Sequence, residues 1–236
     1  MKIAIIGAMV PEVELLRDSI EDMQTSTYAG NEFFEGTLAG VPVVLTACGI
    51  GKVHAATRTQ ALIDHFSPTH IIFTGIAGSL DARIDIGDVV VSTDCVQYDM
   101  SVSVFDYPLG LVPGFEKIGF DADEKLRALA VESVRAATPE VGVFEGRIAT
   151  GDQFVASSEQ KTFIHDTFDA LCCEMEGAAV AQVACVNEIP FVVVRAISDK
   201  ADDSAAMDYP ELELKASHQS AVMVEEMCRR LATCSS

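Results

Sequence analysis

The sequence has few basic residues and no tryptophan: 16 Lys and Arg stand against 36 Asp and Glu, a formal net charge of -20 at pH 7. Such an acidic surface repels phosphate backbones and anionic headgroups, which excludes nucleic acid and membrane surfaces as expected partners. No apolar run reaches the roughly 20 residues that cross a bilayer. Glu12 and Glu14 end the N-terminal apolar run too early for a signal peptide. We therefore expect a soluble, cytoplasmic protein.

The sequence also lacks paired metal-ligand or redox motifs. Its seven cysteines show no C-x-x-C spacing, and its five histidines are scattered and do not pair with the cysteines. Cysteines of this kind are typical of small core residues in a reducing compartment. The sequence predicts neither a structural metal nor a cofactor.

Apolar material is abundant, at 49% of 236 residues, which suits one domain with a single core over residues 1–236. Short, continuous apolar runs recur and predict strands that are covered on both faces, as in a mostly parallel sheet. The less uniform run from Val141 to Ala149 predicts a longer, partly exposed strand. The continuous runs are Ile3 to Ile6, Val41 to Leu45, Ile71 to Phe73, Val89 to Val91 and Phe191 to Val194.

Helical stripes lie between these runs and predict a three-layer α/β/α fold with a mixed central sheet. In open α/β sheets the ligand site lies at the carboxyl ends of the strands. Residues 96–121 are irregular and rich in Tyr, Phe, Pro and Gly, which indicates a binding loop or a subunit contact. The stripes are Val13, Leu16 and Ile20; Ala55, Thr59, Leu62, Ile63 and Phe66; Leu126, Leu129, Ala130 and Val134; and Val224, Met227 and Leu231.

Polar residues follow the last apolar run. Arg195, Ser198 and Asp199 stand at the end of a buried strand, where polar side chains are costly unless they are paired. Ser198 or Asp199 could instead cap a helix, and Arg195 could be a structural ion-pair partner. The cluster nonetheless favours a functional site.

Three acidic residues stand near the starts of helices. Glu12 follows the first strand, and from position alone it is as well explained by the helix dipole as by function. Glu174 and Glu176 open a helix of small residues; in an extended entry they would share one side. Two carboxylates beside so apolar a helix favour a functional site over a purely structural role at the start of the helix.

Glycine turns and an aromatic residue give weaker signals. Gly49 to Gly51 and Gly75 to Gly78 match neither the P-loop nor the dinucleotide fingerprint. Close packing of strand and helix is the safer explanation of these glycines. Phe154 is suited to stacking on a base, although a core phenylalanine is the commoner case.

Together these segments resemble the methylthioadenosine/S-adenosylhomocysteine nucleosidases of the purine nucleoside phosphorylase-like superfamily, nearly from end to end. The Glu-Met-Glu and Val-Val-Arg-Ala-Ile-Ser-Asp segments at this separation are specific; the glycines alone are not. The matching segments are Ile5 to Met9 with Glu12, Gly49 to Val53, Thr74-Gly75 with Ala77-Gly78, Gly87 to Ser92, Gly151-Asp152 with Phe154, Glu174 to Glu176, and Pro190 to Asp199 with Ala201-Asp202.

The resemblance implies a hydrolase that cleaves the N-glycosidic bond of 5′-methylthioadenosine and S-adenosylhomocysteine, with 5′-deoxyadenosine as a further candidate. This reaction belongs to methionine salvage and to clearance of methyl-cycle by-products. Asp199 would protonate adenine N7, and Ser198 would orient its carboxyl group. Glu12 would activate the water that attacks the anomeric carbon, and Arg195 and Glu174 would position that water.

The resemblance also implies which residues bind the substrate. Glu176 and the backbone of Met175 would bind the ribose hydroxyls, while Phe154 would stack on adenine and the Val155 backbone would read its edge. The wall around the 5′-thio group would be Met9, Ile50 and Tyr209. Phe105, Tyr107 and Pro113 resemble a segment that a partner subunit lends to this pocket, which implies a homodimer.

Two positions depart from the pattern of the family. Ile76 stands where a small hydroxyl residue is usual, near the catalytic water, so a potential hydrogen bond is lost and the pocket is narrowed. This change bears on water positioning and on the choice of substrate. Val10 and Pro11 replace an often acidic position and its neighbour, which alters the approach to Glu12 without removing it.

Three alternatives remain. A phosphorylase of the same fold needs cationic residues, but Phe73 and Thr74 stand where its arginine would be, and Glu12 would repel phosphate. Ile76 leaves open a nucleosidase for aminodeoxyfutalosine, an intermediate of menaquinone synthesis. A silent nucleoside-binding protein is disfavoured because Glu12, Glu176 and Asp199 are all retained.

Overall fold

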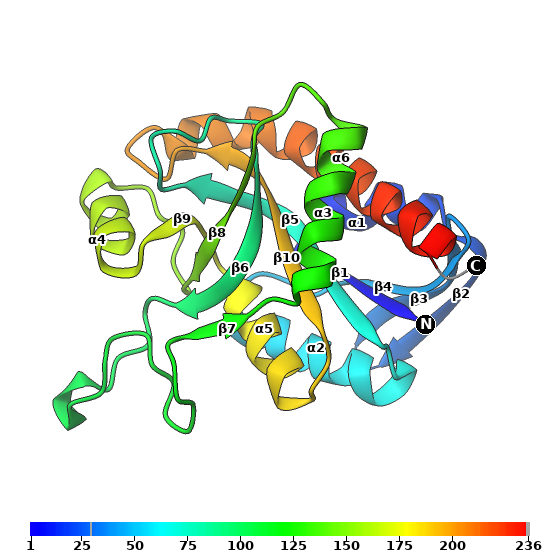
Figure 1. Cartoon of the computed structure of the whole chain (residues 1–236), viewed down its shortest axis with the longest axis horizontal. Helices are drawn as coiled ribbons and strands as arrows, with labels where there is room; N and C mark the ends of the chain where they lie inside the picture. The colour runs from blue at the N-terminus through cyan, green and yellow to red at the C-terminus, as the bar shows by residue number, and fades with distance from the viewer. Residues whose placement is uncertain (29, 235–236) are drawn as a thin grey trace.

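The computed structural model describes residues 1–28 and 30–234, without the side chains of residues 206–214 and 234. In this part of the chain ten strands form one mixed sheet, with helices on both sides (Figure 1). No helix among the described residues is long and apolar enough to cross a membrane. The elements are β1 (Ile3–Gly7), α1 (Val10–Asp18), β2 (Glu21–Tyr28), β3 (Asn31–Leu38), β4 (Val41–Ala47), α2 (Lys52–Phe66), β5 (His70–Ser79), β6 (Val89–Gln97), the 3-10 helix η1 (Ser103–Phe105), β7 (Gly119–Asp121), α3 (Glu124–Ala137), β8 (Val143–Thr150), α4 (Ser158–Phe168), β9 (Ala170–Glu174), α5 (Gly177–Val186), β10 (Phe191–Asp199) and α6 (Ala205–Cys234).

Four parallel strands form the buried centre of the sheet, in the order β4, β1, β5 and β10. Ile5 on β1 lies opposite Leu45 on β4 and Ile72 on β5. Every residue of β1 and of β10 is buried. This burial on both faces explains why these strands are continuous apolar runs. Each of the five continuous runs lies within an observed strand, whereas the run from Val141 to Ala149 begins two residues before β8.

Helices cover the two faces of the sheet, as Figure 1 shows: α1, α3 and α6 lie on one side, and α2 and α5 on the other. Because successive side chains of a strand point to opposite faces, Ile5 and Ile72 pack into one apolar cluster, while Ile6 and Phe73 pack into the other. The predicted α/β fold with a mixed sheet and helices on both sides is confirmed.

The sheet also closes on itself, which the sequence did not predict. Beyond the parallel centre, β10 pairs with β6, β6 with β8, β8 with β9, and β9 returns to β5. The antiparallel pairing of β9 with β5 is confined to Gly78 opposite Cys173 and Ser79 opposite Cys172. Two strands of opposite direction therefore meet at their carboxyl ends, which brings the residues after β9 to the end of β5.

Some local predictions are wrong. Helix α1 ends at Asp18, so Ile20 lies outside it, although Ile20 packs into the same apolar cluster. Glu174 belongs to strand β9, and the helix that it was predicted to open begins at Gly177. The hairpin of β2 and β3 lacks the pattern of a buried strand because β2 is almost entirely exposed.

Candidate active site

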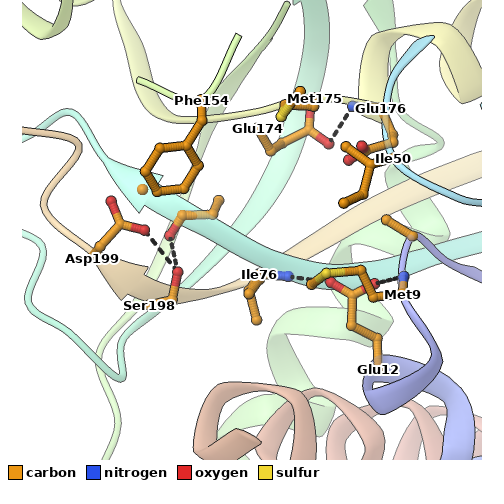
Figure 2. A pocket seen from close by; sticks show the side chains of 13 residues that line it. Met9, Glu12, Ile50, Ile76, Phe154, Glu174, Met175, Glu176, Ser198 and Asp199 are labelled. Carbon is orange, nitrogen blue, oxygen red and sulfur yellow. Dashed lines mark hydrogen bonds between the residues drawn. The ribbon is translucent and has the colours of Figure 1, made fainter. Parts of the chain in front are cut away.

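A pocket of roughly 510 Å³, open mouth included, lies where the carboxyl ends of the strands meet. Residues from six segments line it: the ends of β1, β4, β5, β9 and β10, and the loop after β8. Figure 2 shows Phe154 and Asp199 at one end, and Met9, Glu12 and Ile50 toward the other. The lining residues that the sequence predicted are Met9, Glu12, Ile50, Ile76, Phe154, Glu174, Met175, Glu176, Ser198 and Asp199.

Glu12 lies in the first turn of α1, and only 2% of its surface is exposed. Its carboxylate accepts hydrogen bonds from the backbone N–H of Met9, at 2.8 Å, and of Ile76, at 3.2 Å (Figure 2). Burial raises the pKa of Glu12 above its usual range, against the opposing effect of the Arg195 charge and the backbone donors. The carboxyl group is thus fixed in place and made more basic than a solvated glutamate.

The glycine before Ile76 is required by this carboxylate. A Cβ atom on Gly75 would lie 2.7 Å from Oε1 of Glu12 and 3.1 Å from Nη1 of Arg195. Close approach to functional side chains, and not packing of strand against helix, explains this glycine.

Arg195 on β10 lies beneath the pocket and is 1% exposed. Its Nη2 donates to Oε2 of Glu174 at 2.7 Å, and its guanidinium lies 4.1 Å from the ring centroid of Phe73. Both ion-pair partners are buried, so each depends on the other for compensation of its charge. Arg195 does not line the pocket. It acts on the site through its ion pair with Glu174 and through the effect of its charge on Glu12.

Glu174 ends β9 and accepts three further hydrogen bonds in a buried position. Its Oε2 accepts from the backbone N–H of Glu176 and of Gly177, and its Oε1 accepts from the hydroxyl of Thr150. The Thr150 oxygen in turn accepts from the N–H of Ala178 at 2.8 Å. This network fixes the bend between β9 and α5 and so places Glu174 and Glu176 on the pocket.

Glu176, the N-cap residue of α5, points an oxygen at the turn after β4. Its Oε1 accepts from the backbone N–H of Gly51 at 2.7 Å. Burial, and then the neighbouring charge of Glu174, raise the pKa of Glu176 to about 8. A buried carboxylate with unused lone pairs is suited to accept hydrogen bonds from sugar hydroxyls.

Asp199 ends β10 and is 3% exposed. Its Oδ2 accepts from the hydroxyl of Ser198 at 2.9 Å, and its Oδ1 accepts from the N–H of Ala201 at 2.8 Å. A Cβ atom on Gly78 would lie 2.6 Å from Oδ1, so this glycine also makes space for a pocket carboxylate. Asp199 is therefore held in one orientation, and it does not cap α6, which begins at Ala205.

The remaining wall of the pocket is apolar. Phe154 is 48% exposed and Ile50 55% exposed, so their side chains face the open mouth. Ile76 is 8% exposed and packs with Ala196, Ala216 and Met9. Its side chain occupies the position next to Glu12 that a hydroxyl would otherwise hold.

Several other predicted residues are not among those that line the described pocket. The side chain of Val155 is buried in a separate apolar cluster. Phe105, Tyr107 and Pro113 lie on the segment that projects from the body of the protein between β6 and β7 (Figure 1). Tyr209 lies on α6, outside the residues whose side chains are described.

Sequence reasoning did not single out Thr150, Ala8, Ala77 or Gly78 as parts of the site. Ala8, Ala77 and Gly78 stand within segments that resemble the nucleosidase family, and this resemblance is the signal that could have identified them. Thr150 has no such signal, because its role depends on contacts with β9 and α5. No group of three or more His, Cys, Asp or Glu suited to a metal ion occurs among the described residues.

The chain is similar to known proteins along almost its whole length. The sequence model of the Phosphorylase superfamily matches residues 2–231. A 5′-methylthioadenosine/S-adenosylhomocysteine nucleosidase of Bacillus thuringiensis is 44% identical over 227 residues, 95% of this chain and 97% of the relative. A nucleosidase of the same name from Neisseria meningitidis, solved with methylthio-immucillin-A, has a TM-score of 0.93 at 38% identity and covers 97% of this chain and 99% of its own. A futalosine hydrolase of Helicobacter pylori has a TM-score of 0.92 at 36% identity, with 98% of each chain covered.

Replacing Arg195 with methionine should destabilise the protein strongly, because Glu174 and Glu12 would remain buried without their cation. The expected loss is about 3–5 kcal/mol near pH 8, measured by denaturant unfolding. The pKa of Glu12 would rise further, so the folded state would retain a proton that the unfolded state releases. The loss should therefore shrink as the pH falls toward 5.

The matched control is Arg229→Met, which removes an exposed arginine that pairs with Glu225. It should cost no more than about 1 kcal/mol. Equal losses in the two variants would contradict the structural role of Arg195.

Proposed function

The chain belongs to the Phosphorylase superfamily and, within it, to the 5′-methylthioadenosine/S-adenosylhomocysteine nucleosidases, and from this premise we propose a role for each side of its pocket. The protein hydrolyses the N-glycosidic bond of these two nucleosides and releases adenine and a thio-ribose. One observation carries the choice of water as the attacking group. Four carboxyl groups and no Lys, Arg or His occur among the described residues that line the pocket.

Cleavage of an N-glycosidic bond builds positive charge on the sugar and negative charge on the base. A proton donor beside the base and an activated water beside the sugar meet both needs. Asp199 is the donor and protonates adenine N7, while Phe154 stacks on the base. The hydroxyl of Ser198, 2.9 Å from Oδ2, supports this role because it fixes the orientation of the acid.

Glu12 is the general base for the attacking water. Burial raises its pKa, which makes the carboxylate a stronger proton acceptor near neutral pH. Two backbone donors hold it in place, and the Arg195 charge keeps its ionised form accessible. Glu174 completes the water site from the opposite side, where Arg195 and Thr150 fix its carboxylate.

The substrate lies along the pocket from base to thio group. Glu176 and the backbone of Met175 bind the ribose hydroxyls, and the Val155 backbone reads the adenine edge. Met9 and Ile50, both in the pocket lining, form the wall for the 5′ substituent, with Tyr209 completing it. The apolar character of this wall suits a thioether.

Phosphorolysis is disfavoured because the side chains of the described lining are acidic or apolar apart from the Ser198 hydroxyl, so an inorganic phosphate would meet no cationic group there. A futalosine-type substrate remains a second candidate, since the Helicobacter pylori neighbour named futalosine hydrolase is 36% identical. Ile76, which stands beside Glu12 in place of a small hydroxyl residue, is the position that bears on the choice between these substrates.

Methionine salvage and clearance of methyl-cycle by-products are the setting of the reaction. The six described free cysteines support a reducing, cytoplasmic location.

A homodimer completes the site. Val104 is 84% exposed and Phe105 71% exposed on the projecting segment, and large apolar side chains in such a place need cover. Phe105, Tyr107 and Pro113 of one subunit close the 5′ end of the pocket of its partner.

Sedimentation should give a molecular mass of twice the 25.2 kDa of one chain. Phe105→Asp should weaken both association and substrate binding; a monomer with full activity would refute this assembly.

Adenine release from 5′-methylthioadenosine should proceed in phosphate-free buffer and should not accelerate when phosphate is added. Chromatography of the products separates the outcomes. A phosphate requirement would identify a phosphorylase, and tight binding without product a binding protein. The kcat/KM values for S-adenosylhomocysteine, 5′-deoxyadenosine and aminodeoxyfutalosine would then rank the substrates.

Asp199→Asn should reduce kcat about 10²–10⁴-fold, because an amide N–H is far too weak an acid to transfer a proton to N7. The fold should persist, since the amide oxygen can still accept from Ala201. Asp121→Asn is a control for the same substitution at a position that is 62% exposed. Near-normal turnover by Asp199→Asn would remove Asp199 from the mechanism.

Glu12→Gln is the complementary variant at the other end of the pocket. It should abolish hydrolysis while adenine binding, measured by calorimetry, stays within a few-fold of wild type. Loss of adenine binding in this variant would show that Glu12 acts on the base and not on the water.

A further inference from the structure

Lys52, the first residue of α2, lies just behind the pocket without lining it. Its ammonium group lies 2.5 Å from Oδ1 of Asp99, 3.2 Å from Oε1 of Gln97 and 4.0 Å from Oδ2 of Asp152. Its side chain is only 18% exposed. One cation therefore joins its own segment to two others that are far apart from it in the sequence.

Two of these segments lead to walls of the pocket, and the third leads into the projecting segment. Lys52 follows Gly51, whose N–H holds the Glu176 carboxylate at 2.7 Å. Asp152 lies two residues before Phe154. Asp99 follows the end of β6, where the projecting segment begins.

Backbone contacts tie the same segments together. The N–H of Lys52 donates to Oδ1 of Asp152 at 2.8 Å, and the N–H of Asp152 donates to Oδ2 of Asp99 at 3.0 Å. The two aspartates are thus neighbours, and the Lys52 ammonium lies against both. Without that charge, two carboxylates would repel each other at the junction of the three segments.

We propose that Lys52 is a positioning residue for the nucleosidase site, which holds the Gly51–Glu176 wall and the Phe154 wall at a fixed spacing by joining Asp99 and Asp152. This inference rests on the proposed function, since Glu176 and Phe154 are taken to bind ribose and adenine. Lys52 itself touches neither the substrate nor the reacting atoms.

The contacts that Lys52 supports bind the sugar and the base throughout the reaction. Their loss should therefore weaken substrate binding more than it slows the chemical step. An exposed ion pair with no role beyond its own contact would contribute little to stability and would leave KM unchanged. The division of an effect between KM and kcat thus separates positioning from a local structural role.

The pH profile gives an independent readout. The Gly51 hydrogen bond lowers the pKa of Glu176 against the effects of burial and of Glu174. Arg195, Glu12 and the Cys48 thiol are the other titratable groups that face Glu176. If Gly51 is displaced, the pKa of Glu176 rises, and the acid limb of kcat/KM should move to higher pH because the ionised form accepts the ribose hydroxyls.

The test compares Lys52→Met, Lys52→Arg and the double variant Lys52→Met/Asp99→Asn with wild type, using 5′-methylthioadenosine. Lys52→Met should raise KM roughly ten-fold, with kcat changed by no more than about three-fold, and should move the acid limb upward. Lys52→Arg keeps the charge and should stay close to wild type. The double variant removes the unbalanced negative charge and should recover part of the rise in KM.

Lys2→Met is the matched control, because Lys2 also forms a partly exposed ion pair, with Glu35 on β3, and stands before the start of β1, outside the pocket lining. It should leave KM and the pH profile unchanged. An unchanged KM and acid limb in Lys52→Met, or a double variant no better than Lys52→Met, would overturn the proposal. A lower melting temperature and a smaller active fraction, with KM and the pH profile unchanged, would also overturn it. Failure of the wild type to release adenine would instead refute the proposed function, so the two failures are distinguishable.

Discussion

One buried guanidinium beside three buried carboxyl groups is the constraint on which the site depends. Arg195 forms an ion pair with Glu174 at 2.7 Å, and its charge also acts on Glu12 and Glu176. Removing an ion from water costs several kcal/mol, so none of these groups is tolerable in the interior without the others. The need for mutual compensation fixes the relative positions of α1, β9, α5 and β10.

Closure of the sheet satisfies this constraint. A parallel sheet alone would gather Glu12 and Asp199, which follow β1 and end β10. Glu174 reaches them only because β9 approaches β5 from the opposite direction and pairs with its last residues. Gly75 and Gly78 then leave the space that the carboxylates of Glu12 and Asp199 occupy.

The arrangement separates the chemical tasks by environment. Glu12 is enclosed among backbone donors and close to a cation, whereas Asp199 accepts from a hydroxyl and one backbone N–H. An acid and a base that are both carboxyl groups can work at the same pH only if their surroundings differ in this way. In the proposed mechanism the surroundings decide which carboxyl group gives a proton and which accepts one. Lys52 extends the same logic outward, where a charge balance between loops sets the spacing of the walls.

The sequence by itself determined the layers of the fold and indicated ten of the residues that line the pocket. Runs such as Ile3 to Ile6 predict strands because burial on both faces demands continuous apolarity, and Glu12, Glu174 and Asp199 are conspicuous because charge beside such runs needs a partner. The tertiary structure alone decided the closure of β9 on β5, the function of Gly75 and Gly78, and the contacts of Thr150 and Lys52. These features join residues tens of positions apart. No local pattern encodes such contacts, because they exist only once the chain has closed and each buried charge has found its counterpart.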